Sequence, residues 1–234
     1  MRAPRMRVGV YGDSRTSSLP DLLSTAGHDV SYMDYDPSPP PVEELDLVVL
    51  EVRDTLLESA VERLAERARR GQIFIHTSLQ HGVIVMDPLE VTGAVVIAMG
   101  ELSPTRWAVT TADELGDTIA ELLLGEVGAS GVPCADEERL RLAAAITYVE
   151  AVHSLRRDAM RLLGDAVGDI QEADDIVSAR GTLARLPDAA HLRAQWQAID
   201  NPGQARAFRQ VLRRVAETQH NQDVELWAIQ EEKL

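Results

Sequence analysis

The feature that most constrains this fold is a regular alternation, over the first half of the chain, of short apolar runs and amphipathic segments. The apolar runs lie at 7–11, 30–33, 45–50, 73–75, 94–99 and 107–110, and segments at 19–26, 55–70 and 113–124 have the spacing of helices. Apolar strands separated by helices predict a parallel sheet covered on both faces. Because crossovers between parallel strands are right-handed, the predicted fold class is α/β with a doubly wound sheet.

After Pro133 the pattern changes to helix alone. No glycine or proline occurs from Ala135 to Leu163, and apolar residues recur there at helical spacing. Asp136 is a candidate cap for the start of this long helix, and Gly164 for its end. Further helices are expected at 165–178, at 188–199 and from 201 onward. The sequence therefore predicts an α/β domain at 1–133 and an all-helical domain at 134–234.

Charge and cysteine content narrow the function classes. The net charge is −15, from 23 Lys and Arg against 38 Asp and Glu, and no basic patch stands out, so we expect neither nucleic acid nor a membrane surface as partner. A single cysteine, Cys134, excludes an internal disulfide. No apolar run approaches the roughly 18 residues of a membrane span, and none precedes the first strand as in a signal peptide. We expect a cytoplasmic protein.

The strongest functional motif lies between the first strand and the first helix. Its residues are Gly12, Asp13, Ser14, Arg15, Thr16 and Ser17. At this place a Rossmann fold has G-x-G-x-x-G, which reads here G-x-S-x-x-S. The glycine permits a tight turn, the helix N-terminus offers N–H groups to phosphate, and the arginine adds a charge-assisted contact. The motif predicts a Rossmann-type dinucleotide-binding domain, although a ligand with one phosphate or none stays open.

Asp34 ends the second strand, 22 residues after Gly12. An acidic residue at this point of a Rossmann fold binds the ribose hydroxyls of the adenosine half. It would disfavour a 2′-phosphate, so NAD is the predicted cofactor and NADP the alternative. Asp36, two residues later, is an alternative candidate for the same role. The non-functional interpretation of Asp34 is a solvated carboxylate in a loop.

Two polar segments follow the next strands. Val52 and Arg53, in the run Glu51–Asp54, are assigned to the cofactor because ligands bind at the carboxyl ends of parallel strands; a plain Glu51–Arg53 ion pair is the competing interpretation. The second segment runs from His76 to Gly82. It supplies the candidate catalytic residues His76, Ser78 and His81, with Thr77 near the cofactor, because a histidine can give a proton to a carbonyl that receives hydride.

Each of these assignments has an alternative. His76 can instead be hydrogen-bonded beneath its loop, with Thr77 and Ser78 capping the next helix. His76 and His81 could hold a metal, but two ligands do not make a site, and no metal is predicted. In the helical half Tyr148 is a candidate catalytic residue, and Glu150, His153, Arg185, Asp188 and His191 are further polar candidates, for which helical packing is the default explanation.

Several segments together resemble the 6-phosphogluconate dehydrogenase-like superfamily, to which pyrroline-5-carboxylate reductases belong. They are R-V-G-V-Y-G, A-G-H-D-V-S-Y-M-D and D-L-V-V-L-E-V-R-D. The continuation I-F-I-H-T-S and V-M-D-P-L-E-V-T-G-A-V-V resembles more specifically a short Rossmann-like oxidoreductase family. The runs A-D-E-E-R-L-R-L-A-A-A-I-T-Y and R-L-P-D-A-A-H-L resemble the helical part of that family. The resemblance implies an NAD(P)-dependent oxidoreductase with a small-molecule substrate, and a homodimer formed through the helical domain.

Three functional hypotheses follow. The first is an oxidoreductase that transfers hydride to an unidentified small molecule. The second is a non-catalytic nucleotide-binding or regulatory module. The altered glycine loop favours it, as does the lack, from Ala135 to Leu163, of the lysine that related β-hydroxyacid dehydrogenases carry. The third and weakest is a metal-dependent enzyme built on His76 and His81.

Overall fold

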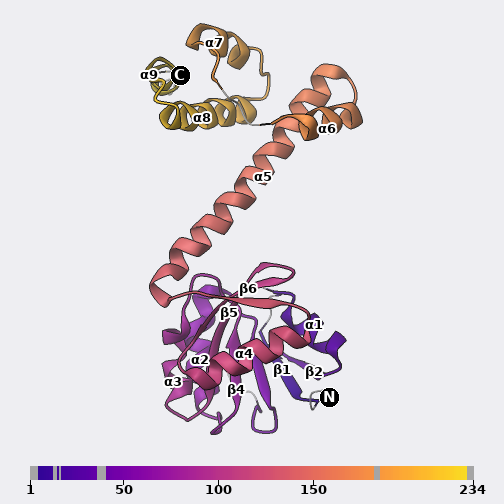
Figure 1. Ribbon diagram of the computed structural model, residues 1–234, viewed down its shortest axis with the longest axis vertical. Coiled ribbons are helices and arrows are strands. Elements are labelled where there is room, and N and C mark those ends of the chain that lie inside the picture. The colour runs from indigo at the N-terminus through magenta and orange to yellow at the C-terminus, as the bar shows by residue number, and fades with distance from the viewer. Residues whose placement is uncertain (1–4, 13–14, 16, 36–40, 182–184, 231–234) are drawn as a thin grey trace. The chain divides into compact units, whose positions relative to one another are not determined.

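The computed structural model describes residues 5–12, 15, 17–35, 41–181 and 185–230 (Figure 1). Contacts divide the chain into two compact units, Met1–Thr147 and Tyr148–Leu234. Helix α5 (Arg139–Val167) runs through this division. The domain boundary between residues 133 and 134 stays a prediction.

The first unit is built on one sheet. Its strands are β1 (Arg7–Tyr11), β2 (Asp29–Met33), β3 (Leu47–Leu50), β4 (Ile73–His76), β5 (Val95–Ser103), β6 (Arg106–Thr111) and β7 (Ser130–Pro133). Its helices are α1 (Leu19–Ala26), α2 (Leu57–Ala65), α3 (Asp87–Glu90) and α4 (Glu114–Glu126), with 3-10 turns η1 (Asp54–Leu56), η2 (Val83–Met86) and η3 (Asp136–Glu138). In the described part of the chain the strand order is β2-β1-β3-β4-β5-β6-β7. The predicted α/β class is confirmed.

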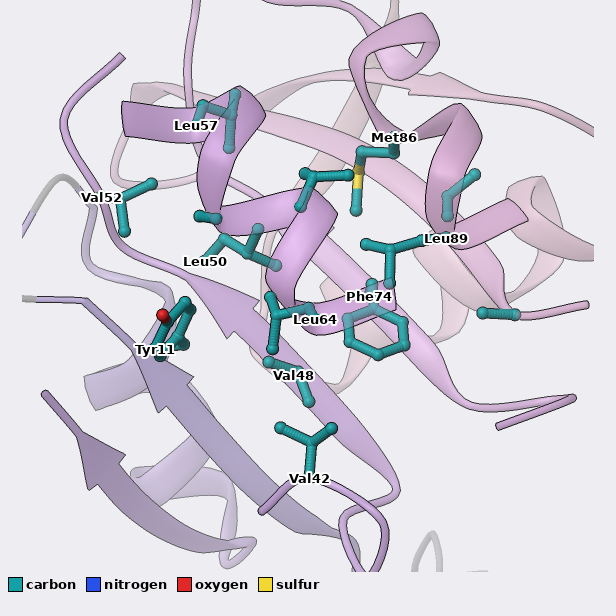
Figure 2. Close-up of a cluster of buried hydrophobic side chains, with 14 residues drawn as sticks. Tyr11, Val42, Val48, Leu50, Val52, Leu57, Leu64, Phe74, Met86 and Leu89 are labelled. Atoms are coloured by element: carbon teal, nitrogen blue, oxygen red, sulfur yellow. The ribbon is translucent and has the colours of Figure 1, made fainter. Parts of the chain in front are cut away.

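The apolar strands are buried because their side chains contribute to two hydrophobic cores, one on each face of the sheet. Along β3, Leu47 and Val49 belong to one cluster of buried side chains, while Val48 and Leu50 belong to the other. Helices α1 and α4 cover the first cluster, and α2, α3 and η2 cover the second, which Figure 2 shows. A strand with a core on each face needs an apolar residue at every position, which explains the run L-V-V-L.

Strand order places a crevice beside β1. The chain goes from β1 to β2 on one side and then to β3 on the other, and both pairs are parallel. The carboxyl ends of β1 and β3 thus flank a topological switch point, where ligands bind in open α/β sheets.

The wholly parallel sheet expected from the alternation is wrong at one strand. Strand β6 pairs antiparallel with β5. Only Pro104 and Thr105 join the two, whereas a parallel crossover needs about a dozen residues, so the connection can only be a hairpin. The edge strand β7 follows, parallel to β6; its sequence S-G-V-P carries too little apolar character to be recognised as a strand.

Helix α5 departs from its predicted ends at both termini. Asp136 does not begin it but lies in η3. Gly164 does not end it: the helix continues to Val167, and Gly168 has the left-handed φ of 78°. A Cβ at Gly164 would lie 2.9 Å from the side chain of Ile170, so this glycine permits close packing of the next helix.

The second unit continues with α6 (Ile170–Ala179), α7 (Ala189–Gln197), α8 (Pro202–Thr218) and α9 (Gln222–Gln230). Leu192 from α7, Leu212 and Ala216 from α8, and Trp227 from α9 form its buried core. Asp188 and Asn201 cap α7 and α8 through their side-chain oxygens. The sequence did not predict α9 as a separate helix.

Candidate functional site

The carboxyl end of β1 makes a turn that only glycine can adopt. Gly12 has φ of 142°, and its N–H donates to the carbonyl oxygen of Met33 at 3.0 Å. A Cβ at this position would lie 2.1 Å from the carbonyl oxygen of Glu51. Gly12 therefore lets the loop after β1 pass directly over the end of β3.

A cavity of about 240 Å³ opens at this turn. It is lined by Val10, Gly12, Arg15, Ser17, Pro20, Asp21, Tyr32, Asp34 and Glu51. The structure thus brings together four residues assigned to the cofactor from sequence: Gly12, Arg15, Ser17 and Asp34. Asp13, Ser14 and Thr16, and the alternative Asp36, lie outside the described residues.

The cavity lining includes an exposed cation. The side chain of Arg15 is 80% exposed and lies 3.8 Å from the carboxylate of Asp21, itself 69% exposed. Exposed pairs of this kind contribute little to stability. Arg15 is therefore available to an anionic ligand at small cost.

Glu51 is the buried acid of the site. Its residue is 2% exposed, and its carboxylate oxygens accept from the Ser17 hydroxyl at 2.6 Å and the Ser17 N–H at 3.1 Å. Glu101 on β5 acts similarly, since its Oε2 accepts from the Ser18 N–H at 2.8 Å. Sequence reasoning weighed a Glu51–Arg53 ion pair; instead Glu51 bonds to the start of α1, and Arg53 is exposed at the start of η1. Two carboxylates thus bind the N–H groups of the two residues that directly precede α1.

The loop after β4 holds two histidines with different surroundings. His76 is wholly buried, and its Nε2 donates to the carbonyl oxygen of Gly82 at 2.9 Å. Burial, with a smaller contribution from the positive charge of Arg139, lowers the pKa of His76 to about 4. Nδ1 has no hydrogen-bond partner among the described residues. His76 is therefore a neutral residue beneath the loop near pH 7.

His81 lies at the surface of the same loop. Its Nδ1 is 3.1 Å from the Ser78 hydroxyl and 3.6 Å from Oδ1 of Asp54, and its side chain is 30% exposed. Gln80 donates from Nε2 to the other oxygen of Asp54 at 2.5 Å. Both partners of His81 approach one ring nitrogen, so this group is not a relay in the manner of a serine protease. Its Nε2 has no partner in the part of the chain that the structure describes.

A buried arginine supports this loop from below. Arg139 is 0% exposed, and it donates to the carbonyl oxygens of Ser78, Ala98 and Ala108 at 3.4, 2.7 and 3.2 Å. It also donates to the hydroxyl of Thr110. Burial lowers the pKa of Arg139, although a guanidinium stays charged in proteins. The first residue of α5 thus joins β5, β6 and the loop after β4.

Asp136 fixes the other end of the loop. Its carboxylate oxygens accept from the N–H groups of Val83 and Ile84 at 2.9 and 3.0 Å, and so cap η2. A Cβ at Gly82 would lie 2.0 Å from the Asp136 carboxyl carbon. Sequence reasoning assigned this acid to the wrong helix, because a contact over 53 residues leaves no local signal.

The remaining candidates are dispersed. Val52 is 5% exposed and belongs to the core that α2 covers, and Thr77 is buried, its hydroxyl 3.4 Å from the carbonyl oxygen of Leu50. Tyr148 belongs to the second unit, where it is 63% exposed. Within the described ranges, no three His, Cys, Asp or Glu side chains gather as a metal site. None of the helices described there is long and apolar enough to cross a membrane.

Two protein families match this chain, one for each part. Residues 2–101 match the family described as Rossmann-like domain, and residues 135–231 match the family described as 6-phosphogluconate dehydrogenase C-terminal domain-like. These matches confirm the resemblance seen in the sequence. A search of curated proteins gives no match.

Solved structures with the same fold include three reductases. A 1-pyrroline-5-carboxylate reductase from Streptococcus pyogenes is 14% identical with a TM-score of 0.57, covering 98% of this chain and 99% of that one. An imine reductase from Bacillus cereus is 14% identical with a TM-score of 0.53, covering 96% and 98%. A Plasmodium falciparum pyrroline carboxylate reductase with NADP bound is 10% identical with a TM-score of 0.52, covering 96% of each. At these identities the likeness is one of fold.

Proposed function

We propose that this chain, in which a Rossmann-like domain precedes a 6-phosphogluconate dehydrogenase C-terminal-like domain, is an NAD(P)-dependent oxidoreductase. The observation that carries the proposal is the cavity at the switch point of the sheet. It joins the Gly12 turn, the cation of Arg15 and the carboxylate of Asp34. These are the groups that a dinucleotide needs for its phosphates and its adenosine ribose.

The residues present fit the adenosine half of such a cofactor. Asp34 would accept hydrogen bonds from the ribose hydroxyls and repel a 2′-phosphate, so NAD is the expected cofactor. Gly12 removes the Cβ that would otherwise fill the turn, and Arg15 can neutralise a phosphate. A bound reduced nicotinamide would supply the hydride. The related reductases in this fold act on pyrroline-5-carboxylate and on imines, which makes an imine the first substrate class to test.

His81 is the residue that we assign to proton transfer. Its Nε2 is open in the described structure, while Ser78 and Asp54 hold its Nδ1 side. The Ser78 hydroxyl fixes the ring, and the proton would leave from Nε2. His76 is unsuited to this role because its Nε2 proton is bound to Gly82 and its burial opposes charge.

Cofactor binding tests the proposal directly. We expect NADH to bind the full chain at millimolar concentration or below, measured by fluorescence and by thermal shift. Replacing Asp34 with Ala should lower the affinity for NADH at least about tenfold and the affinity for NADPH by less, since a ribose-binding carboxylate is lost. Asp29→Ala, at the exposed first residue of β2, which Asp34 follows, is the matched control and should change neither affinity. Failure of both cofactors to bind would refute the oxidoreductase assignment.

A nucleotide-binding module without catalysis is the second candidate. The observation in its favour is that Glu51 and Glu101 occupy the N–H groups of Ser17 and Ser18, where a dinucleotide phosphate would be expected. Turnover separates the two candidates. NADH oxidation in the presence of a cyclic imine, lost in His81→Gln but kept in the exposed control His153→Gln, would support the oxidoreductase. Tight NADH binding with no turnover of carbonyl or imine substrates would support the module.

The assembly that we propose is a homodimer formed by the second unit. A groove of about 830 Å³ runs between α5 and α8, lined by apolar side chains that include Tyr148, Val152, Leu155, Phe208 and Val211. Tyr148, Val152 and Val211 are 63, 48 and 42% exposed. A second copy is the favoured occupant because Arg156, Asp158 and Arg214 also line the groove, and both charge signs suit a self-complementary contact.

A further inference from the structure

Two carboxylates of the same chain lie just before the first helix of the Rossmann-like domain, α1. A phosphate in such a fold is expected at the N-terminus of this helix, where unpaired N–H groups and the helix dipole attract negative charge. Here the Ser17 N–H and hydroxyl donate to Glu51, and the Ser18 N–H donates to Glu101. Two donors of Ser17, which lines the cavity, and the N–H of the neighbouring Ser18 therefore have carboxylate partners.

Glu51 differs from the other acids of the cavity in its burial. Asp21 lines the same cavity, but its side chain is 69% exposed, so water screens its charge. Glu51 is 2% exposed and lies directly under the turn, where the effective dielectric constant is lower. A phosphate that approached Ser17 would meet this charge at short range and with little screening.

The backbone fixes the place of Glu51. Its carbonyl oxygen is the atom that a Cβ at Gly12 would strike, and its N–H donates to the carbonyl oxygen of Tyr11 at 2.9 Å. Glu51 follows β3, which pairs directly with β1. The acid is thus held at the switch point by main-chain contacts and does not depend on a flexible loop.

We propose that Glu51 determines the phosphate specificity of the cavity. Its carboxylate holds the Ser17 donors that a phosphate would otherwise take. The phosphate is left with the exposed Arg15, whose contact is weakened by water, so a nucleotide binds mainly through its nucleoside part. This inference rests on the proposed function, since it concerns how the same cavity discriminates among adenine nucleotides. Glu51 is a specificity residue, and it takes no part in hydride or proton transfer.

The affinity ratio of AMP to adenosine measures this effect. In the wild-type full chain we expect AMP to bind no more tightly than adenosine in isothermal titration calorimetry. In Glu51→Gln, which keeps the size and removes the charge, AMP should bind at least about tenfold more tightly, with adenosine changed by less than about twofold. NAD⁺ should gain in parallel with AMP. The unchanged adenosine affinity shows that the variant is folded.

Two variants control for other causes. Asp21→Asn removes an exposed charge from the same cavity and should change the ratio by less than about threefold, because that charge is screened. Glu51→Asp keeps the charge and should leave the ratio close to that of the wild type. If net charge alone set the affinity ratio of AMP to adenosine, Asp21→Asn and Glu51→Gln would raise that ratio equally.

The outcomes separate this inference from the proposed function. If the wild type already binds AMP far more tightly than adenosine, or if Glu51→Gln leaves the ratio unchanged, the role of Glu51 is refuted while the nucleotide site stands. If neither protein binds adenosine, AMP or NAD⁺, the nucleotide site itself is refuted, and the role of Glu51 with it.

Discussion

The Nε2 atom of His76 lies 2.9 Å from the carbonyl oxygen of Gly82, and this bond satisfies one nitrogen of a wholly buried ring. Burial lowers the pKa of His76 to about 4, against about 6.5 in an unfolded chain. Between these values the unfolded state binds more protons than the native state, so the free energy of unfolding falls as the pH falls from about 6.5 toward 4. Below about pH 4, protonation of His76 lowers the free energy of unfolding no further.

Urea unfolding at pH 7.5 and pH 5 tests this linkage. The loss of stability between the two should be smaller in His76→Gln by about 2 kcal/mol, because the amide can still donate to Gly82 but does not titrate. His153→Gln removes an exposed imidazole and should keep the wild-type pH dependence. Equal pH dependence in wild type and His76→Gln would contradict the buried neutral assignment.

Arg139 should tolerate no replacement, including lysine. Its guanidinium serves carbonyl oxygens from three segments at once, and an ammonium on a flexible stem cannot reproduce that fork. Arg139→Lys should lower the free energy of unfolding by roughly 3 kcal/mol, since buried acceptors lose partners and a charge is left poorly paired. Arg141→Lys, on an exposed side chain of the same helix, should change it by less than about 0.5 kcal/mol. Similar stability of the two variants would argue against this role.

Replacement by alanine should destabilise the protein at Gly12 and stabilise it at Gly125. At Gly12 a Cβ meets the Glu51 carbonyl oxygen and φ is positive, so Gly12→Ala should destabilise by more than about 2 kcal/mol and weaken NADH. Gly125 is helical with open space around it, so Gly125→Ala should stabilise by about 0.5–1 kcal/mol. Chemical denaturation measures both. A neutral Gly12→Ala would mean that the turn can relax away from β3.

Charge placed in the α5–α8 groove should weaken the proposed dimer. Val152→Glu and Val211→Glu each put a carboxylate into the apolar lining, and the dissociation constant should rise at least about tenfold in sedimentation velocity. Leu226→Glu on α9 is the control, because Leu226 is 55% exposed and does not line the groove. A wild-type monomer at micromolar concentration would count against the dimer.

Much of the fold could be predicted because its signals are local. The apolar run at 45–50 predicts a strand, which the structure places at Leu47–Leu50, and the helix at 19–26 begins and ends where its sequence indicates. The direction of β6 was missed although a local cue existed, namely the two residues that separate it from β5. Strand β7 was missed because an edge strand needs few apolar residues.

The site was less predictable because its decisive contacts are distant in sequence. Gly12, Arg15, Ser17 and Asp34 could be gathered from motif spacing, and they line one cavity. The bonds from Ser17 to Glu51, from Ser18 to Glu101 and from Val83 to Asp136 span 34, 83 and 53 residues. No periodicity or short motif encodes such pairs. They follow only from the register of the sheet and the course of the chain into α5.

The pairing of Glu51 with Ser17 also makes the protein a competitor for its own binding site. A tethered carboxylate is present at a fixed effective concentration that dilution does not change, whereas a free ligand competes by mass action. Any phosphate that must displace this carboxylate therefore has its apparent dissociation constant raised by a constant factor, which the fold sets and protein concentration does not alter.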